Sequence, residues 1–260
     1  MELRTFIWCV KRYTKVGDTI LDPMSGTGTI HFANFMGRST VGIELVPRFA
    51  EMQERNWQNL HRLWEEDKFY DLQTDEEWDH KYDPEIISTM DIPSHSILQG
   101  DCRRHLPLRT NVQAVIFSPP YGNLWKFSEA QRTSKVALEK KYVVGYDDSD
   151  ANVGNYDNYT AYTNAMRLVY AKCLESVQSG GIMVTIVKDY VKGGRRVNCS
   201  RDNWRVALEA GWQHHEWHLR DASMTSSPFQ VKAKADRIAK GKHTRELEVT
   251  TEDIIVLRKP

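Results

Sequence analysis

The chain has 260 residues, of which 40% are hydrophobic and 27% are charged, and its formal net charge is zero. This length favours one large domain with its own core over two small domains. The composition is typical of a soluble globular protein, and no apolar run approaches the roughly 20 residues that a membrane span needs.

Strand candidates alternate with helical stretches along the chain. The expected strands are residues 18–22, 39–45, 96–101, 112–117, 181–189, 212–220 and 253–259. The expected helices are residues 30–37, 46–63, 159–178 and 202–210, with a short helix or turn after residue 101. This alternation predicts an α/β fold, in which a doubly wound, mostly parallel seven-stranded sheet forms the middle of a three-layer sandwich.

We expect one domain over residues 1–260, with an acidic insertion at 63–93, a polar loop at 122–157 and a basic segment at 221–250. Charge runs of this kind usually mark solvated loops. A second interpretation places the basic run 232–245 along a phosphate backbone, with the acidic insertion pointing away from it. Because the charges are unevenly distributed along the chain, a net charge of zero does not exclude a nucleic-acid partner.

The N-terminal stretch and the cysteines bear on where the protein is located. The N-terminal stretch has too short an apolar patch and no small-residue cleavage site, so it does not resemble a secretory signal. The four cysteines are widely spaced and form no CxxC pair: Cys9, Cys102, Cys173 and Cys199. This spacing argues against a zinc ribbon and a disulfide framework, and the expected location is a reducing cytoplasm.

Each of the first four expected strands ends in a polar or rigid residue: Asp22, Glu44, Asp101 and Ser118. In an open sheet, ligands bind outside the carboxyl ends of the strands, where the strand order reverses. One acid at a strand end is common by chance, but four polar ends in succession are not. We therefore expect the binding site at this edge of the sheet.

The turn DPMSGTGT (22–29) supplies Gly26 and Gly28, which let the backbone pass close to a ligand and lead it to a helix N-terminus. It lacks the lysine of a phosphate-binding loop, so nucleoside triphosphates are not expected. The Glu44 carboxylate can accept hydrogen bonds from both hydroxyls of a ribose. The turn, Glu44 and Asp101 together predict a pocket for an adenosine, and NAD would also fit such a pocket.

The Asp101 carboxylate can accept a hydrogen bond from an adenine amino group, and the amide of Cys102 lies beside it in the sequence. A purely structural alternative is that Asp101 caps the short helix that follows. Glu44 has the same alternative, as a cap of the next helix.

The turns DPMSGTGT and SPPY (118–121) together resemble the S-adenosylmethionine (SAM)-dependent methyltransferases that modify exocyclic amines of nucleic-acid bases. In that family the cofactor turn is DPF or DPM followed by a GSGT-like run, and the catalytic turn is (D/N/S)PP(Y/F/W). The segments VGDTILD, GIEL and GDC match the family in the same order. The resemblance covers roughly residues 1–220, without the long loop and the basic segment.

The resemblance implies SAM as the cofactor and a set of residues that hold it: Phe6, Asp22, Pro23, Gly26, Thr27, Gly28, Glu44, Asp101 and Cys102. It also implies that the Ser118 side chain and the Pro119 carbonyl accept from the amino group, which turns the nitrogen lone pair toward the methyl group. Pro120 would stiffen the turn, and Tyr121 would stack on the extruded base.

Serine in the first position of SPPY resembles the subgroup that methylates N4 of cytosine, whereas Asp or Asn is usual for N6 of adenine. The resemblance therefore implies DNA with a flipped target base as the partner. An adenine-N6 or RNA enzyme on the same scaffold stays open, as does a catalytically silent binding module. The sequence also leaves open whether the enzyme is the partner of a restriction enzyme, a phage enzyme or a solitary enzyme.

Two further segments have competing interpretations. His214, Glu216 and His218 are expected to share one face of a strand, a spacing that could hold a metal, although polar residues on an exposed face are the preferred interpretation. The turn KDYVKGGRR is either an exit loop or a segment that places Lys188 or Arg195 near a phosphate or the flipped base.

Overall fold

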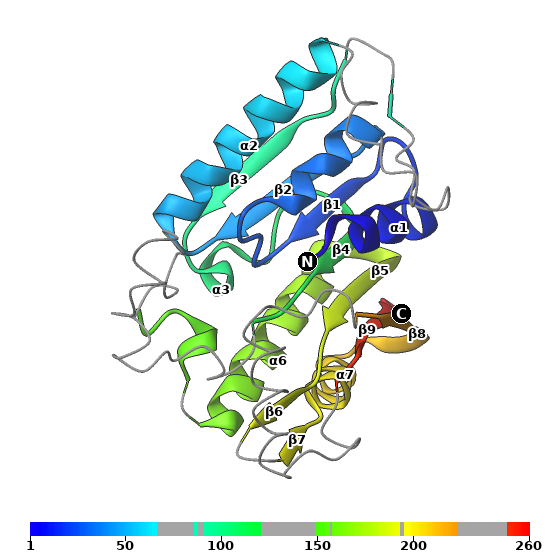
Figure 1. Cartoon of the computed structure of the whole chain (residues 1–260). Helices are drawn as coiled ribbons and strands as arrows, with labels where there is room; N and C mark the ends of the chain where they lie inside the picture. The colour runs from blue at the N-terminus through cyan, green and yellow to red at the C-terminus, as the bar shows by residue number, and fades with distance from the viewer. Residues whose placement is uncertain (67–85, 88–90, 121–148, 157, 193–194, 223–248) are drawn as a thin grey trace, which may run out of the picture.

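The computed structural model of the protein describes residues 1–66, 86–87, 91–120, 149–156, 158–192, 195–222 and 249–260 (Figure 1). Among these, no helix is both long enough and apolar enough to cross a membrane. The greater part of the three expected insertions lies outside the described residues, so the prediction of a single domain over 1–260 is not tested. Helix α2 (Pro47–Glu65) extends into the first residues of the acidic insertion.

A seven-stranded sheet forms the centre of the fold, in the order β3-β2-β1-β4-β5-β9-β8. Its strands are β1 (Thr19–Asp22), β2 (Ser39–Glu44), β3 (His95–Gln99), β4 (Val112–Phe117), β5 (Val177–Val187), β8 (Gln213–Asp221) and β9 (Thr251–Arg258). Strands β1 to β5 are parallel, and β9 runs antiparallel to both of its neighbours, β5 and β8. The predicted doubly wound, mostly parallel seven-stranded sheet is confirmed.

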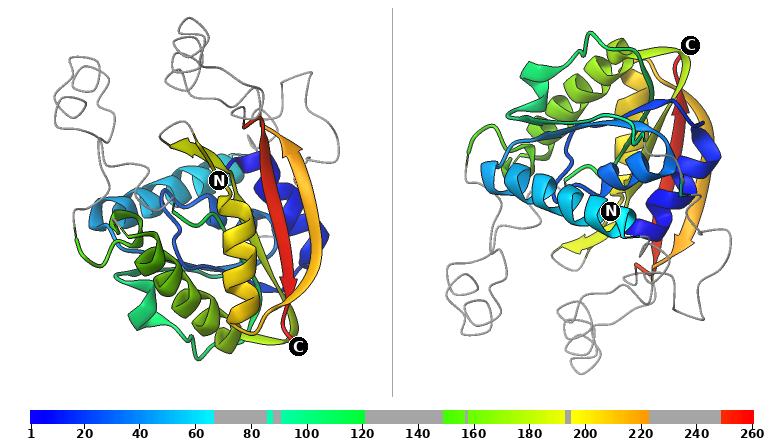
Figure 2. Two further views of the ribbon diagram at one scale, coloured as in Figure 1. Left: turned by 90° about the horizontal axis from the view of Figure 1, so that it is seen from below. Right: turned by 90° about the horizontal axis from the view of Figure 1, so that it is seen from above.

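Helices cover both faces of this sheet (Figure 2). Helices α6 (Tyr159–Ser176) and α7 (Cys199–Glu209) pack on one face, where their buried side chains join those of the strands in one core cluster. Helix α1 (Leu3–Tyr13) and the 3₁₀ helix η1 (Thr29–Met36) pack on the other face, with apolar residues of α2 at the margin. The fold is therefore a three-layer sandwich with a separate apolar core on each side of the sheet.

Strand β4 shows why the sequence specifies this arrangement. Val115 and Phe117 belong to the core cluster on the α6 and α7 face, whereas Ala114 and Ile116 belong to the cluster on the α1 face. Successive side chains of a strand point to opposite faces, so a strand buried on both sides must be apolar at every position. This requirement explains the apolar run AVIF at 114–117, whereas Gln113 near the start of the strand is only partly buried.

Several elements differ from the expectation, and helix α1 has no counterpart among the expected helices. The stretch expected as a helix at 30–37 is the 3₁₀ helix η1, bounded by Gly28 and Gly37 in the left-handed region. Strand β5 begins earlier than expected, at Val177. The turn KDYVKGGRR forms a two-stranded antiparallel sheet, β6 (Tyr190–Lys192) and β7 (Arg195–Val197), which extends beyond the end of β5.

Candidate active site

The ends of β1, β2 and β4 meet at one edge of the sheet, because these strands are adjacent and parallel (Figure 1). Asp22 is the last residue of β1 and Glu44 the last residue of β2, and Ser118 directly follows β4. Asp22 is 4% exposed and Glu44 6% exposed. Two buried carboxylates and a serine at neighbouring strand ends provide hydrogen-bond acceptors at the place where such sheets bind ligands.

Glu44 is held by the backbone of the glycine turn and of the following helix. The Gly26 amide donates to Oε2 over 2.8 Å, and the Val46 amide donates to Oε1 over 2.8 Å. Burial raises the pKa of Glu44, and the backbone donors oppose this shift without cancelling it. Each carboxylate oxygen has a second lone pair, so the fixed carboxylate can still accept from two hydroxyls.

Asp22 has fewer donors around it. Its Oδ1 accepts from the Met24 amide over 2.9 Å, which closes the first turn of the segment DPMS. Burial raises the pKa of Asp22 to about 7, against the effects of the Met24 hydrogen bond and of the positive N-terminus. A carboxyl group with this pKa becomes charged readily when a cationic ligand arrives.

The glycine turn has no room for side chains where it crosses helix α2. Gly28 has a φ of +89°, and a Cβ built on it would lie 2.7 Å from Cγ of Gln53. A Cβ on Gly42, in the neighbouring strand β2, would lie 2.9 Å from Oγ of Ser25. Close backbone approach, in addition to the left-handed conformation at Gly28, therefore requires glycine at these two positions.

Gln53 of α2 supports the glycine turn and was not found by sequence reasoning. It is fully buried, and its Nε2 donates to Oγ of Ser25 over 2.9 Å and to the Gly26 carbonyl over 2.8 Å. Its position carries a signal: Gln53 stands four residues from Phe49 and from Trp57, on the packed side of α2. A polar side chain there needs buried partners.

His31 continues this buried cluster. Its Nε2 lies 3.0 Å from Oε1 of Gln53, and its Nδ1 lies 2.8 Å from Oγ1 of Thr40. Burial lowers the pKa of His31 to about 4, so the ring is neutral near pH 7. The cluster thus links the glycine turn to η1 and β2 through uncharged hydrogen bonds.

Asp101 caps helix α3 (Cys102–His105) and forms an ion pair. Its Oδ1 accepts from the Arg103 amide over 2.9 Å, and its Oδ2 lies 2.8 Å from Nη2 of Arg103. Burial on its own would raise the pKa of Asp101, but the hydrogen bonds and charge of Arg103 outweigh burial and lower it. Asp101 therefore caps the short helix, as the alternative interpretation of the sequence expected. Its contact with an adenine stays a prediction.

Cys102 is the first residue of α3 and is buried. The first amides of a helix have no partner within it, so the Cys102 amide is one of the donors that α3 offers to a neighbouring group. All four cysteines are buried free thiols.

The start of the SPPY turn is anchored to both neighbouring elements. The Ser118 hydroxyl donates to the Ile186 carbonyl of β5 over 2.6 Å, and the Tyr162 hydroxyl of α6 donates to the Pro120 carbonyl over 2.8 Å. No described residue donates to the Pro119 carbonyl. Tyr121 lies outside the described residues.

Comparisons with known proteins identify the fold. No protein-family model matches the chain, and no curated protein matches it. Solved structures do match. A putative methyltransferase from Bacillus halodurans aligns with a TM-score of 0.52 at 10% identity, over 99% of this chain and 98% of its own. The chain has the Rossmann-like fold of SAM-dependent methyltransferases.

Two further structures have the same fold. Geranyl diphosphate methyltransferase in complex with SAM aligns with a TM-score of 0.51 at 11% identity, over 99% of this chain and 84% of its own. TrmN from Thermus thermophilus aligns with a TM-score of 0.50 at 11% identity, over 99% of this chain. This chain covers 48% of the TrmN chain, about half its length.

The other predicted cofactor residues differ in accessibility. Pro23 is buried, whereas Thr27 is exposed, and its carbonyl accepts from Nδ2 of Asn56 over 2.9 Å. The Phe6 ring has no exposed surface and packs in the core on the α1 face. A ring without exposed surface offers no contact to a ligand in this conformation, so the structure gives Phe6 a core role, and its cofactor contact stays a prediction.

The expectation that His214, Glu216 and His218 share one face of a strand is wrong. A register shift between His214 and Glu216 turns the strand, so that His214 pairs with Leu257 and Glu216 with Val256. The His214 ring therefore lies against Trp204 of α7, on the opposite face from Glu216. No group of three or more His, Cys, Asp or Glu side chains that could hold a metal occurs in the described part of the chain.

Glu216 and His218 instead join the end of α1 to the edge strand β8. Oε2 of Glu216 accepts from the Tyr13 hydroxyl over 2.8 Å and lies 2.7 Å from Nε2 of His218. The Tyr13 and His218 hydrogen bonds lower the pKa of Glu216 to about 2.

Lys188 follows β5 directly, at the same edge as Ser118, and Nζ lies 3.4 Å from the Ala222 carbonyl. Burial lowers the pKa of Lys188. Arg195 is exposed at the start of β7.

Proposed function

We propose that the protein is a SAM-dependent methyltransferase that acts on an exocyclic amine of a DNA base, with N4 of cytosine as the target. The single observation that carries this proposal is the Ser118 hydrogen bond to Ile186. A hydroxyl has one proton and two lone pairs. Because the proton of Ser118 points to the backbone of β5, both lone pairs are left for an incoming N–H group.

The cofactor pocket supports the same proposal. SAM consists of an adenosine joined to a sulfonium and an amino acid, so it carries ribose hydroxyls and positive charge. Glu44 offers a fixed carboxylate for the hydroxyls, and Asp22 offers a buried carboxyl group for the positive charge. In the turn between them, a Cβ built on Gly26 would meet no atom within 4 Å, so this glycine leaves room for a ligand beside the backbone.

The proposed reaction needs acceptors and does not need a strong base. The lone pair of the base amine is conjugated with the ring until its N–H groups are turned toward Ser118 and the Pro119 carbonyl. The nitrogen then forms a bond to the methyl carbon, and the carbon–sulfur bond breaks with its electron pair going to sulfur. One N–H proton passes to solvent. In this scheme Pro120 stiffens the turn and Tyr121 stacks on the extruded base.

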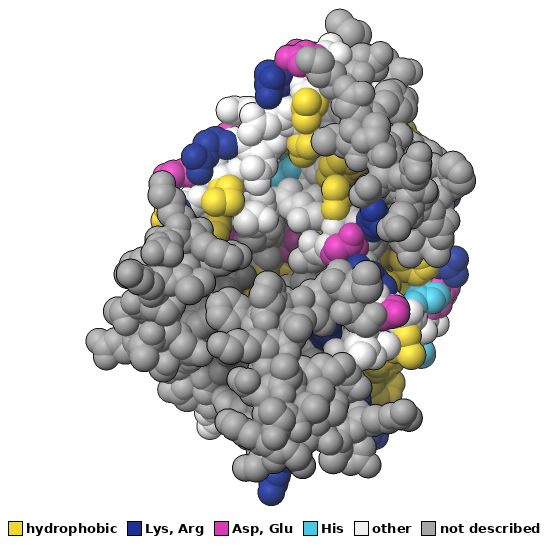
Figure 3. Space-filling model, viewed as in Figure 1, with side chains coloured by type: hydrophobic (Ala, Val, Ile, Leu, Met, Phe, Trp, Pro, Cys, Tyr) yellow, Lys and Arg dark blue, Asp and Glu magenta, His cyan; other side chains and the backbone are white. Residues whose placement is uncertain are grey.

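An adenine-N6 or RNA enzyme on the same scaffold is the second candidate function. On the face seen in Figure 3, acidic and basic side chains of the described residues are interspersed. The described part of this face therefore offers no large field of one sign. The basic run 232–245, which lies outside the described residues, carries the charge that would favour a phosphate backbone.

Product analysis tests the proposal. The protein is incubated with methyl-labelled SAM and, separately, with duplex DNA, single-stranded DNA and RNA, and each product is digested to nucleosides for mass spectrometry. We expect N4-methylcytosine from DNA. N6-methyladenine or a methylated ribonucleoside would support the second candidate, and 5-methylcytosine would overturn the mechanism, because methylation at carbon needs a nucleophile such as cysteine.

Ser118→Ala tests the role of the hydroxyl in the same assay. Loss of one acceptor in a water-excluded site is expected to cost roughly 2 to 4 kcal/mol in the transition state, or about thirty- to a thousandfold in turnover. Calorimetric binding of SAM is the control and should be unchanged. Tyr121→Ala should likewise reduce turnover far more than SAM binding.

A further inference from the structure

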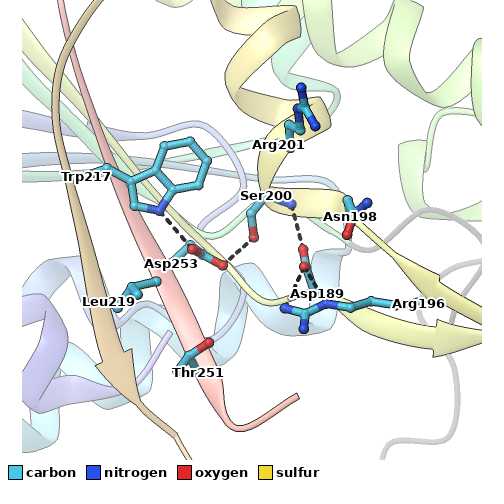
Figure 4. A pocket seen from close by; sticks show the side chains of 9 residues that line it. All are labelled: Asp189, Arg196, Asn198, Ser200, Arg201, Trp217, Leu219, Thr251 and Asp253. Atoms are coloured by element: carbon cyan, nitrogen blue, oxygen red, sulfur yellow. Dashed lines mark hydrogen bonds and ion pairs between the residues drawn. The ribbon is translucent and has the colours of Figure 1, made fainter. Parts of the chain in front are cut away.

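A surface hollow opens beyond the end of β5, between strand β8 and the start of helix α7 (Figure 4). On one side lie Trp217 and Leu219, two apolar side chains of β8 that are 37% and 68% exposed. On the other side lie Arg196 of β7 and Asn198 and Arg201 around the first turn of α7. One wall is therefore apolar and the other is polar and cationic.

The floor of the hollow is formed by two buried aspartates whose donors come from the protein itself. Asp189 accepts from the Ser200 amide over 3.0 Å and pairs with Arg196 at 3.0 Å. Asp253 accepts from the Ser200 hydroxyl over 2.6 Å and from Nε1 of Trp217 over 2.8 Å. These contacts fix the floor and hold the Trp217 ring in place.

Arg201 contributes a positive charge that the described residues do not neutralise. Arg196 is paired with Asp189, whereas no described residue accepts from the Arg201 guanidinium. Asn198 stands at the N-cap of α7, but its side chain does not cap the helix, because Asp189 binds the Ser200 amide instead. Both Arg201 and Asn198 thus have donors left for an anionic group.

The strand register places this hollow near the catalytic turn. Phe117, the residue before Ser118, is aligned with Thr185, then with Ile255, and then with Trp217. Trp217 is therefore three strands away from Phe117, or roughly 14 Å at the usual spacing between strands. All the lining residues lie toward the same edge of the sheet as Ser118.

We propose that this hollow binds a nucleotide of the substrate strand close to the target base, with its base on the Trp217 ring and its phosphate at Arg201. The proposal rests on the proposed nucleic-acid substrate. An aromatic face takes any base by stacking, and a guanidinium binds a phosphate through two parallel hydrogen bonds. A hollow with one apolar wall and one cationic wall matches the two halves of a nucleotide.

Photo-crosslinking tests the position of the ligand without relying on activity. The wild-type protein is mixed with a single-stranded oligodeoxynucleotide that carries 5-iododeoxyuridine at successive positions, irradiated, digested and mapped by mass spectrometry. We expect a cross-link to Trp217 from a position near the target. Efficient cross-linking elsewhere on the chain, with none at Trp217, would overturn the inference.

Variants then measure the contribution to affinity, by fluorescence anisotropy of a labelled oligodeoxynucleotide. Trp217→Ala should weaken binding roughly 5- to 150-fold, whereas Trp217→Phe, which keeps a ring but loses the bond to Asp253, should retain most of it. Arg201→Ala should lower the salt dependence by about one unit of slope. The matched control is Arg205→Ala, an exposed arginine of α7 that pairs with Asp202 and does not line the hollow.

SAM binding separates the two hypotheses. If SAM binds and DNA is methylated, but Trp217→Ala and Arg201→Ala bind the oligonucleotide like the wild type, the hollow is not a nucleotide site and the proposed function stands. If neither SAM nor any nucleic acid binds, the proposed function is wrong, and the inference that rests on it is overturned with it. Equal losses for Trp217→Ala and Trp217→Phe would show that the ring acts only through its bond to Asp253, and would also overturn the inference.

Discussion

Glu44 and Asp22 are buried carboxyl groups at the ends of neighbouring strands. Their different hydrogen-bond donors suit them to different functions. Both oxygens of Glu44 accept backbone amides, so this carboxylate is fixed in position. Asp22 accepts one backbone amide and has a pKa near 7. The first is suited to orienting neutral hydroxyls, and the second to responding to a positive charge.

Glu44→Ala should weaken SAM binding by roughly 1.5 to 3 kcal/mol, the usual range for hydrogen bonds to a charged group. Glu51→Ala, at an exposed glutamate of helix α2, is the matched control and should bind SAM like the wild type. Titration calorimetry measures both, and circular dichroism checks the fold. Wild-type affinity in Glu44→Ala, or tight binding of NAD by the wild type, would contradict the assignment.

Asp22 predicts a pH dependence with a definite sign. Its folded-state pKa lies above the unfolded value, so the folded state binds more protons between about pH 4 and pH 7, and stability falls as pH rises through this window. Asp22→Asn removes the carboxyl group that must lose its proton in this pH window. The melting temperature of the variant should therefore exceed that of the wild type at pH 8 and should differ little from it at pH 4. A gain that is the same at both pH values would contradict the shifted pKa.

At the scale of elements, helix α2 holds the cofactor turn in place. Gln53 donates to the Ser25 hydroxyl and the Gly26 carbonyl, and it contacts His31 of η1. The turn therefore has little freedom to move independently of the helix, since its buried polar groups have these partners.

Gln53→Leu should destabilise the protein by roughly 1 to 3 kcal/mol, because it leaves buried polar groups without partners. It should also weaken SAM binding, because the turn loses its support. Denaturant unfolding and calorimetry measure the two effects. Gln58→Leu is the control, since Gln58 is exposed on the same helix and its side chain hydrogen-bonds to Glu54 instead of to the turn. Similar effects in the two variants would contradict a specific role for Gln53.

At the scale of the whole molecule, nucleic-acid binding is predicted to come from segments added to the sheet. The basic run 232–245 carries Lys232, Lys234, Lys240 and Lys242. Replacing these lysines with alanine should flatten the salt dependence of DNA binding by about one unit of slope for each phosphate that the variant no longer binds. Filter binding over a salt series measures it. A slope unchanged from the wild type, as expected for the control Lys15→Ala, would mean that the run is a solvated loop.

The local sequence was sufficient to predict the seven strands of the sheet in chain order and the edge at which Asp22, Glu44 and Ser118 lie, although it missed helix α1 and strands β6 and β7. Apolar runs such as 112–117 mark strands buried on both faces, and the residues that end them, such as Asp22 and Glu44, follow from the strand boundaries. These are local properties, since side-chain periodicity and strand termination depend on neighbouring residues in the chain.

Tertiary structure alone decided which side chains become partners. The pairing of Gln53 with Ser25, the bond from Ser118 to Ile186, and the hollow between β8 and α7 all join residues far apart in the sequence. The faces of His214 and Glu216 depended on a single register shift, which reverses the side of a strand on which a residue lies. Hydrogen bonds and stacking act over a few ångströms, so these contacts were determined only when the folded chain brought their atoms together.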